Sequence, residues 1–553
     1  MLAVILFASV VIFALAFFTY GRFLDKHYDI DPNRPTPSHT DYDGVDRVPA
    51  HRAVLLGHHF SSIAGAGPVV GPIIAAIAFG WMPVLAWIIL GAIFIGGVHD
   101  FSALIASVRH KARSIADIAK EYMSPLSYKL FLAFMWLSII YVLVVFTDLT
   151  ASTFVEDGGV ASSSLLFIAL AIGFGLSVYR FHVPVLWSSI IFVPLVFVAV
   201  WLGQQIPILA EKVPCIIGRD PGKTWDIVLV FYCFVASTTP VWILLQPRDY
   251  LSSFLLYASV LGGFLGILLG GFGINYPMFT GWATSQMGPL FPMLFITVAC
   301  GACSGFHAIV ASGTSSKQLN NEADARTIGY GAMLIEGLVA VLALATVAML
   351  GKNDALLSKA PLIIYGQGMG KFLSTFGLSE NIGFSFGLLA LSTFILTTLD
   401  TATRLGRYIF EEFFNLKGTQ CRYFSTIATL ALPTVFVLIT LKDSAGNPMP
   451  AWKLIWPVFG ATNQLLAGLV LLVGALWLKK NGKKTFFIII PMVFMNVLTV
   501  LALLFLLKHY KFSAVGIIAA ILLLLAVVLI FEACKVFKKA FIPACSNHPR
   551  VSS

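Results

Sequence analysis

The sequence predicts an all-α polytopic membrane protein, and three observations support that fold class. Of the 553 residues, 58% are hydrophobic and 11% are charged, and the mean hydropathy is +0.89. The apolar residues fall into about fifteen runs of roughly 18 or more residues, the length that spans a bilayer as a helix. Lys and Arg gather in alternate loops between these runs, as the positive-inside rule requires. This composition excludes a soluble globular domain.

Each apolar run predicts one transmembrane helix. The first run has no Lys or Arg before it and lacks a clear small-residue cleavage site, so we expect a membrane helix rather than a signal peptide. Most of the 36 Lys and Arg residues follow odd-numbered runs, which predicts an N-terminus outside and a C-terminus in the cytoplasm. The runs begin near residues 2, 53, 82, 129, 161, 185, 226, 251, 290, 331, 383, 422, 455, 485 and 513.

The net charge of +10 has a membrane explanation. The lysine cluster at residues 479–484 and the basic C-terminal tail are expected to contact anionic lipids of the cytoplasmic leaflet. The sequence has no basic face with interleaved aromatic residues, so nucleic acid is not an expected partner. Cys300 and Cys303 form a C-x-x-C without ligands at matching spacing, which favours helix packing over a metal or redox site. No cofactor or metal is expected.

The segment GHHFSSIAGAGPVVGP, residues 57–72, interrupts the second run with four glycines and two prolines. Hydrocarbon offers the backbone no hydrogen-bond partner, so an unwound segment survives there only where it is buried in protein or lines a wet cavity. A helix that restarts after the break would present free N–H groups and a positive dipole end to an anion such as a carboxylate. The alternative is that the glycines only permit close helix crossing. The candidate substrate-binding residues here are Ser61, Ser62, Gly65, Ala66 and Gly67.

Topology supplies a counterpart for this break. If runs two to six form one unit and runs seven to eleven another, each unit has five spans, so the second unit is inverted and run seven corresponds to run two. Run seven, DIVLVFYCFVASTTPVWILLQP, has polar residues and Pro240 near its middle. We therefore expect a five-plus-five inverted-repeat core in which two broken helices face each other across a midplane pocket. The candidate substrate-binding residues in run seven are Ser237, Thr238 and Thr239.

Ionisable side chains within apolar runs are costly and therefore indicate function. His58 and His59 stand beside the first break, and helical neighbours point about 100° apart, so at most one is expected to face a pathway. With Asp100 and Asp400 they are the candidates for proton coupling. The alternatives are hydrogen-bonded structural histidines and, for Asp400, an intrahelical ion pair with Arg404. Three further ionisable residues within apolar runs are secondary candidates, His307, Glu336 and Asp148.

Six long strings carry a resemblance to a known family: DPNRPTPSHTDYDGVDRVP, GHHFSSIAGAGPVVGP, FPMLFITVACGACSGFHAIVASGTSSKQL, TIGYGAMLIEGLVA, TTLDTATRLGRY and WPVFGATNQLLAG. They resemble the carbon starvation protein A family over about residues 31–468. That family is grouped with the amino acid, polyamine and organocation transporter superfamily, which implies a core like that of the leucine transporter. Its members are described as starvation-induced inner-membrane transporters associated with peptide uptake, and relatives with proton-coupled pyruvate uptake.

A hydroxyl-rich stretch ends the ninth run and suggests a cation site. In the fold that the resemblance implies, the helix at this place supplies hydroxyls to a sodium site against the first broken helix, and oxygen ligands suit a hard cation. The candidates are Ser312, Thr314 and Ser315. A proton-coupled relative would keep this geometry without sodium, and the hydroxyls can instead bond to the preceding turn. The proton is therefore the expected coupling ion.

These expectations together describe a secondary active transporter that imports a small carboxylate-bearing nutrient, pyruvate or a similar acid, with protons in the carbon-starvation response. Small peptides are the alternative substrate, since a peptide also ends in a carboxylate. A gated channel is less favoured because the sequence has no charge rings or selectivity-filter motif, and an enzyme is not expected. The chain divides into an N-terminal helix and cytoplasmic loop (1–52), a transport core (53–410) and accessory helices (411–553). Its oligomeric state is not predicted.

Overall fold

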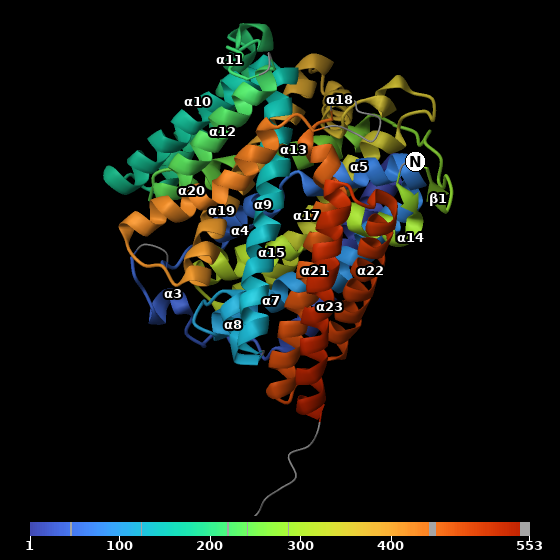
Figure 1. Ribbon diagram of the computed structural model, residues 1–553. Coiled ribbons are helices and arrows are strands. Elements are labelled where there is room, and N and C mark those ends of the chain that lie inside the picture. Colours follow the sequence, from blue (N-terminus) through green and yellow to red (C-terminus); the bar gives the residue numbers. More distant parts are fainter. Residues whose placement is uncertain are drawn as a thin grey trace, which may run out of the picture.

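The computed structural model is a bundle of helices with one two-stranded hairpin in the part of the chain that it describes (Figure 1). The structure describes residues 1–541 except 45–46, 123, 218–219, 241, 286 and 442–448. The hairpin pairs β1 (Ala283–Thr284) with β2 (Gly288–Pro289) in antiparallel orientation. The mostly helical architecture agrees with the predicted fold class.

The first half of the chain forms thirteen of the described helices. They are α1 (Leu2–Phe18), α2 (Tyr20–His27), α3 (Pro37–Thr40), α4 (Arg52–Ile63), α5 (Gly67–Phe79), α6 (Trp81–Gly91), α7 (Gly97–Arg109), α8 (Ile115–Tyr122), α9 (Pro125–Glu156), α10 (Gly158–Gly175), α11 (Val185–Gln205), α12 (Pro221–Thr238) and α13 (Leu245–Leu269). Short π or 3-10 segments are η1 (Ala92–Gly96), η2 (Leu176–Arg180) and η3 (Ala210–Lys212).

The second half contains the remaining described helices. They are α14 (Leu290–Thr297), α15 (Gly305–Val310), α16 (Ser316–Gln318), α17 (Ala332–Ala348), α18 (Pro361–Ser374), α19 (Glu380–Phe414), α20 (Thr419–Leu438), α21 (Ala451–Lys480), α22 (Phe486–Tyr510) and α23 (Ala514–Phe541). The short π or 3-10 segments are η4 (Ala311–Ser315), η5 (Glu322–Asp324), η6 (Arg326–Gly331) and η7 (Ala355–Ser358).

Twelve helices of the described chain are long and apolar enough to cross a membrane, or thirteen if the bent pair α4 and α5 is one span. The expected count of fifteen is therefore not confirmed. Two of the fifteen predicted runs account for the difference. One is α12, which has Lys223 and Asp226 in its first two turns. The other is the run from residue 290, which is cut into the short helices α14 and α15.

The predicted break in the second run is confirmed. α4 ends at Ile63, α5 begins at Gly67, and the two helices are bent by 45°. Ala64 leaves the helical conformation, with φ −79° and ψ 55°. Pro68 then suits the first turn of α5, because the N–H that proline lacks would have no intrahelical partner there. The break therefore follows from the local sequence.

A second discontinuous helix lies at residues 290–318. α14 ends at Thr297, residues 298–304 form turns, and α15 restarts at Gly305 and continues through η4. The turn sequence VACGACS consists of small residues except for Val298, so another backbone can approach it closely. The resemblance included this string, but the sequence analysis did not identify it as a break.

The helix of run seven does end at the predicted residues, since α12 ends at Thr238 and α13 begins at Leu245, but α13 is long enough to span the membrane by itself, so the two are separate helices and not halves of one broken span. Pro240 cannot continue the helix, since it lacks an N–H and its ring clashes with the preceding turn. The chain then starts α13 as a separate long helix at Leu245. Arg404 of α19 donates to the carbonyls of Ala236 and Thr239, at 2.8 and 2.7 Å, and so satisfies the C-terminal end of α12.

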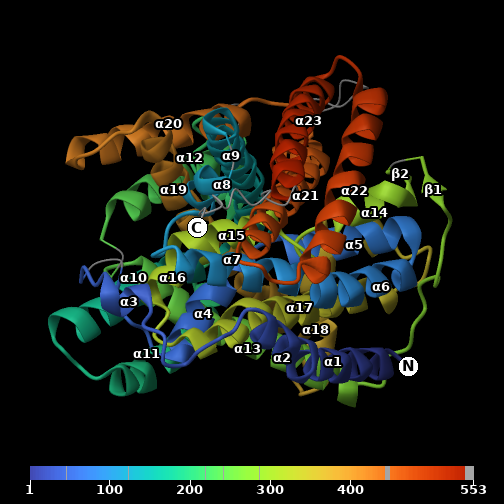
Figure 2. The ribbon, with the colours of Figure 1, turned by 90° about the horizontal axis from the view of Figure 1, so that it is seen from below.

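α21 lies in the interior of the molecule, although the proposed division at residue 410 would place it among accessory helices. All of its apolar window is buried. Asn463 accepts from the N–H of Phe306 and donates to Ser304, both at 3.0 Å, and Gln464 donates to the carbonyl of Phe295 at 2.5 Å. α21 therefore holds the second broken helix. Figure 2 shows α22 and α23 beside it.

The segment between α2 and α4 is bound along the linker that joins the second broken helix to α17. Glu322 in this linker is fully buried and accepts from Arg34 at 2.9 Å, from Arg109 at 2.8 Å and from the N–H of Asp31 at 2.9 Å. Ser38 donates to the carbonyl of Leu319 at 2.8 Å. In Figure 1 this region, with α3 and α8, lies at the opposite end of the molecule from α18 and the N-terminus. We call residues 29–39 the strap.

Candidate functional site

The two broken helices meet at their breaks. A Cβ atom added to Gly67 would lie 2.3 Å from Sγ of Cys300, and one added to Gly71 would lie 2.4 Å from the carbonyl oxygen of Thr297. Only glycine fits such a close approach. Two discontinuous helices therefore face each other, as the sequence predicted, but the partner of α4–α5 is α14–α15. Close helix crossing, the alternative to substrate binding, therefore explains why residues 67 and 71 are glycines.

The other candidates at the first break are buried. Ser61 donates to the carbonyl of Asp249 at 3.3 Å, and the carbonyl of Ser62 accepts from Thr398 of α19 at 3.3 Å. The hydroxyl of Ser62 has no hydrogen-bond partner among the described residues. An unsatisfied buried hydroxyl costs roughly 1–3 kcal/mol. Of the predicted substrate-binding residues, Ser62 is therefore the one whose side chain is free to bind a ligand. Gly65 and Ala66 are also buried.

The candidates in run seven have partners of their own. Thr238 donates to the carbonyl of Phe234 at 2.9 Å, and Thr239, the residue after α12, donates to that of Val235 at 2.6 Å. Ser237 lies 3.4 Å from the hydroxyl of Thr426 on α20. These contacts follow from α12 being a continuous helix, in which a hydroxyl reaches the carbonyl one turn back. None of these hydrogen bonds connects the three residues to the first break.

The adjacent histidines of α4 point to different helices. Nδ1 of His58 lies 2.7 Å from Oδ2 of Asp249 on α13, and Nδ1 of His59 lies 2.7 Å from Oγ of Ser315 on η4. Both rings are buried, and neither Nε2 atom has a hydrogen-bond partner in the described chain. His58 therefore connects the first broken helix to α13, whereas His59 connects it to the second broken helix.

Asp400 of α19 pairs with Arg248 of α13 rather than with Arg404. The two side chains form an ion pair, Tyr232 of α12 donates to Oδ2 of Asp400 at 2.7 Å, and Arg248 donates to the carbonyl of Leu396 at 3.3 Å. Arg248 is 0% exposed and Asp400 is 1% exposed. The alternative intrahelical pair does not form because Arg404 reaches across to the end of α12. Three helices thus contribute to this network, which adjoins His58 through Asp249.

Asp100 of α7 lies at the centre of a second buried network. Its carboxylate oxygens lie 2.7 Å from Nδ1 of His99 and 2.8 Å from Nδ1 of His307 on α15. Nε2 of His307 lies 3.2 Å from Oε2 of Glu336 on α17, without the alignment of a hydrogen bond. All four side chains are fully buried. The network therefore connects the second broken helix to α7 and α17. α7 packs against α15 of this broken helix, and α17 packs against α5 of the first broken helix.

The hydroxyls of the predicted cation site are engaged elsewhere. Ser312 and Thr314 donate to the carbonyls of Ala308 and Val310, one turn back, at 2.7 and 3.0 Å. Ser315 is bound to His59. The bonds of Ser312 and Thr314 match the alternative to a cation site, in which the hydroxyls bond to carbonyls of the preceding turn. The described chain also contains no group of three or more His, Cys, Asp or Glu that could hold a metal ion.

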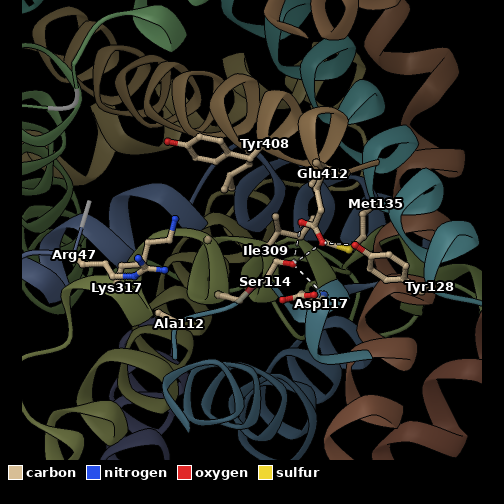
Figure 3. A pocket seen from close by; sticks show the side chains of 14 residues that line it. Arg47, Ala112, Ser114, Asp117, Tyr128, Met135, Ile309, Lys317, Tyr408 and Glu412 are labelled. Atoms are coloured by element: carbon tan, nitrogen blue, oxygen red, sulfur yellow. Dashed lines mark hydrogen bonds between the residues drawn. The ribbon is translucent and has the colours of Figure 1, made fainter. Parts of the chain in front are cut away.

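A pocket of about 320 Å³ lies between α8, α9, α19 and η4 (Figure 3). Arg47 and Lys317 line one side of it, and Asp117 and Glu412 lie across from them. Tyr128 of α9 donates to Glu412 at 2.9 Å. The pocket therefore offers both signs of charge on the face of the second broken helix that is turned toward α8. We call it the vestibule.

Several members of these networks were missed or underrated from the sequence. The sequence predicts that the eighth run starts near residue 251, after Arg248 and Asp249, whereas α13 begins at Leu245 and includes both residues. An adjacent Arg–Asp pair next to apolar sequence was the available signal. His307 and Glu336 were only secondary candidates. Tyr232 gave no signal, because a tyrosine in an apolar run has no distinguishing pattern.

A polytopic helical protein in which two broken helices meet beside buried ionisable side chains has the architecture of a membrane transporter. The family model for the carbon starvation protein CstA matches residues 1–366 and 349–502, so the chain belongs to this family. The chain is similar to the peptide transporter CstA of Campylobacter jejuni, with 32% identity over 89% of this chain and 78% of that protein. It is equally similar, at 32%, to the pyruvate/proton symporter BtsT of Escherichia coli over 90% of this chain and 81% of that protein.

Two solved structures are similar to the chain at a lower level. MhsT in complex with L-phenylalanine has 12% identity and a TM-score of 0.48 over 89% of this chain and 99% of that one. A manganese transporter of Eremococcus coleocola has 13% identity and a TM-score of 0.44 over 90% of this chain and 98% of that one. Similarity of this degree carries no argument about the site.

Proposed function

We propose that this protein imports a small carboxylate, pyruvate or a similar short acid, by symport with protons. Its similarity to a pyruvate/proton symporter supports the substrate and the coupling ion. The observation that carries the proposal is the pair of adjacent histidines on the first broken helix, each in contact with a different set of buried polar groups. Ionisable groups are costly inside a membrane, and they are typical of proton relays and charged-substrate pathways.

The proposed substrate site is the break between α4 and α5. Ser61, Ser62, Gly65 and Ala66 line the break, and α5 starts at Gly67 with a positive dipole end that favours an anionic substrate. The unpartnered hydroxyl of Ser62 supports this placement. This site does not include Ser237, Thr238 and Thr239, because their hydrogen bonds lie within or beside α12 and do not connect them to the break.

The coupling proton is proposed to use the two buried networks. Sodium is less favoured, because the hydroxyls of Ser312, Thr314 and Ser315 are bound to carbonyls and to His59. The four ionisable candidates in or next to the two networks are His58, His59, Asp100 and Asp400.

The proposed setting is the bacterial inner membrane, with the N-terminus outside and the C-terminus in the cytoplasm. The distribution of Lys and Arg supports this orientation. In this orientation the vestibule, which lies beside α8, is on the cytoplasmic side of the molecule. The family name supports a role in the response to carbon starvation.

Small peptides are the second candidate substrate, and the vestibule is the observation that favours them. Arg47 and Lys317 face Asp117 and Glu412 across about 320 Å³. A zwitterionic peptide presents a carboxylate and an ammonium group to such a pair of opposite charges. Several relatives are named peptide transporters, which also supports this alternative.

Uptake by the purified protein in proteoliposomes tests the proposal. Labelled pyruvate and labelled di- and tripeptides are offered separately, with an imposed pH gradient, a sodium gradient or no gradient. We expect saturable accumulation of pyruvate that requires the pH gradient and ignores sodium. Accumulation of peptides alone would establish the second candidate. Equilibration that never exceeds the external concentration would instead identify a channel.

A further inference from the structure

The Arg248–Asp400 pair is buried, and both of its members have hydrogen-bonding groups that are not used. Nη1 of Arg248 contacts Asp400, Tyr232 and the carbonyl of Leu396. Nε and Nη2 of Arg248 are buried and have no partner among the described residues, and the same is true of Oδ1 of Asp400. A guanidinium binds a carboxylate through two parallel N–H donors, and the Nε–Nη2 edge is such a fork.

The residues beside the Arg248–Asp400 pair contact the first broken helix. Asp249, the residue after Arg248, is bonded to His58 and accepts from Ser61 through its carbonyl, so α13 contacts α4 one turn before the break. Arg248 also contacts α19 at Leu396, close to Thr398, which donates to the carbonyl of Ser62. The Arg248–Asp400 pair therefore lies where the predicted substrate-binding residues of α4 contact α13 and α19.

The net charge of the Arg248–Asp400 pair couples the binding of an anion to the binding of a proton. With Arg248 positive and Asp400 negative, the buried pair is neutral. A substrate carboxylate bound to Arg248 would add one uncompensated negative charge at a buried site, which is strongly unfavourable. A proton on Asp400 removes that charge. An anion and a proton are therefore accommodated together far better than either is alone.

We propose that Arg248 binds the carboxylate of the substrate and that Asp400 takes up the coupling proton. This inference rests on the proposed function and assigns two of its steps to named atoms. A proton binds the free Oδ1 of Asp400, the ion pair with Arg248 opens, and Nε and Nη2 of Arg248 donate to the substrate carboxylate. No covalent bond other than that to the proton changes. The charge of the site is the same before and after binding, so one monocarboxylate moves with one proton without net charge.

The surroundings of Asp400 suit this role. Tyr232 donates to Oδ2 and leaves Oδ1 for the proton. Asp100, by comparison, has both carboxylate oxygens occupied by imidazole nitrogens, so it has no free oxygen of this kind. The titratable and charged groups that surround Asp400 are Arg248 and Asp249 of α13, Tyr232 and Cys233 of α12, Arg404 of α19 and, through Asp249, His58 of α4.

The test uses the full-length protein in proteoliposomes with labelled pyruvate. Asp400→Asn mimics the protonated carboxyl, so we expect exchange of pyruvate across the membrane to persist, its affinity to lose its dependence on pH, and accumulation driven by the pH gradient to fall at least tenfold. Arg248→Lys keeps the charge but loses the fork, and we expect KM to rise at least tenfold. Asp226→Asn is the matched control, since Asp226 is also a buried membrane carboxylate and belongs to neither network.

A structural ion pair would give different results. The double variant Arg248→Gln with Asp400→Asn has no buried charge left unpaired, so we expect it to fold, as judged by thermal unfolding, and not to bind pyruvate. Recovery of pyruvate transport in this variant would overturn the inference. So would pH-driven accumulation by Asp400→Asn at the wild-type level, an unchanged KM in Arg248→Lys, or wild-type accumulation driven by a membrane potential alone. A wild-type protein that accumulates no carboxylate would overturn the proposed function itself.

Discussion

Gly67 shows how one residue can combine a local and a tertiary role. It begins α5 after the break, and its missing side chain makes room for Cys300 of the opposite break. We predict that Gly67→Ala lowers stability by about 1–3 kcal/mol, the usual cost of overpacking, because the new Cβ would lie 2.3 Å from Sγ of Cys300. Thermal unfolding in detergent measures the loss.

Two further variants make the Gly67 prediction specific. Cys300→Gly in the same chain removes the obstructing atoms and is expected to recover part of the loss. Gly351→Ala is the matched control, since a Cβ at Gly351 meets nothing within 4 Å. Equal melting temperatures for Gly67→Ala and Gly351→Ala would contradict the close contact between the two breaks.

The buried carboxylates Asp100 and Glu336 are expected to differ sharply. Asp100 satisfies two imidazoles, so Asp100→Asn leaves one of them without an acceptor, and we predict a loss of about 3–5 kcal/mol. Glu336 makes no aligned hydrogen bond, so Glu336→Gln is predicted to cost less than about 1 kcal/mol. Thermal unfolding of the two variants side by side gives the comparison. A larger loss in Glu336→Gln would show that the network is arranged differently.

At the scale of elements, the strap holds the linker after the second broken helix through Glu322. We predict that Glu322→Gln weakens the contacts with Arg34 and Arg109, because a neutral amide replaces a carboxylate that accepts from both. The expected result is faster amide hydrogen exchange in residues 29–39 and 318–326. Glu121→Gln is the control, since Glu121 pairs with Arg113 at the surface, where an ion pair contributes about 0–1 kcal/mol. Unchanged exchange in Glu322→Gln would mean that the strap is held by its other bonds.

The elements also show why one break was predicted correctly and the other was not. Residues 57–72 contain two prolines and three closely spaced glycines, which disrupt a helix wherever it is placed. Residues 298–304 contain Ala, Cys, Gly and Ser, which are as typical of a tightly packed membrane helix as of a break. In run seven, Pro240 does end a helix, but it marks a boundary between α12 and α13 and not an interruption of one span.

The orientation of the whole molecule is still a prediction, and two cysteines can test it, the exposed Cys215 and the half-buried Cys421. Cys215 precedes α12 on the side predicted to be outside, and Cys421 begins α20 on the side predicted to be cytoplasmic. One variant keeps Cys215 and lacks Cys421, and the other keeps Cys421 and lacks Cys215. A membrane-impermeant maleimide added to intact cells is expected to label Cys215 and not Cys421. The reverse labelling pattern would invert the proposed topology and place the vestibule outside.

The amino-acid sequence by itself determined the fold class, the membrane setting, the family and the break at residues 57–72. Composition, hydropathy and the conformational limits of proline and glycine act locally, so they can be read along the chain. Only the tertiary structure decided that α14–α15 is the partner of that break, that α21 is buried, and that Asp400 pairs with Arg248 across two helices instead of with Arg404 four residues away. Those choices depend on which helix surfaces fit together and on which buried charges then meet, and neither is encoded in the spacing of residues along one segment.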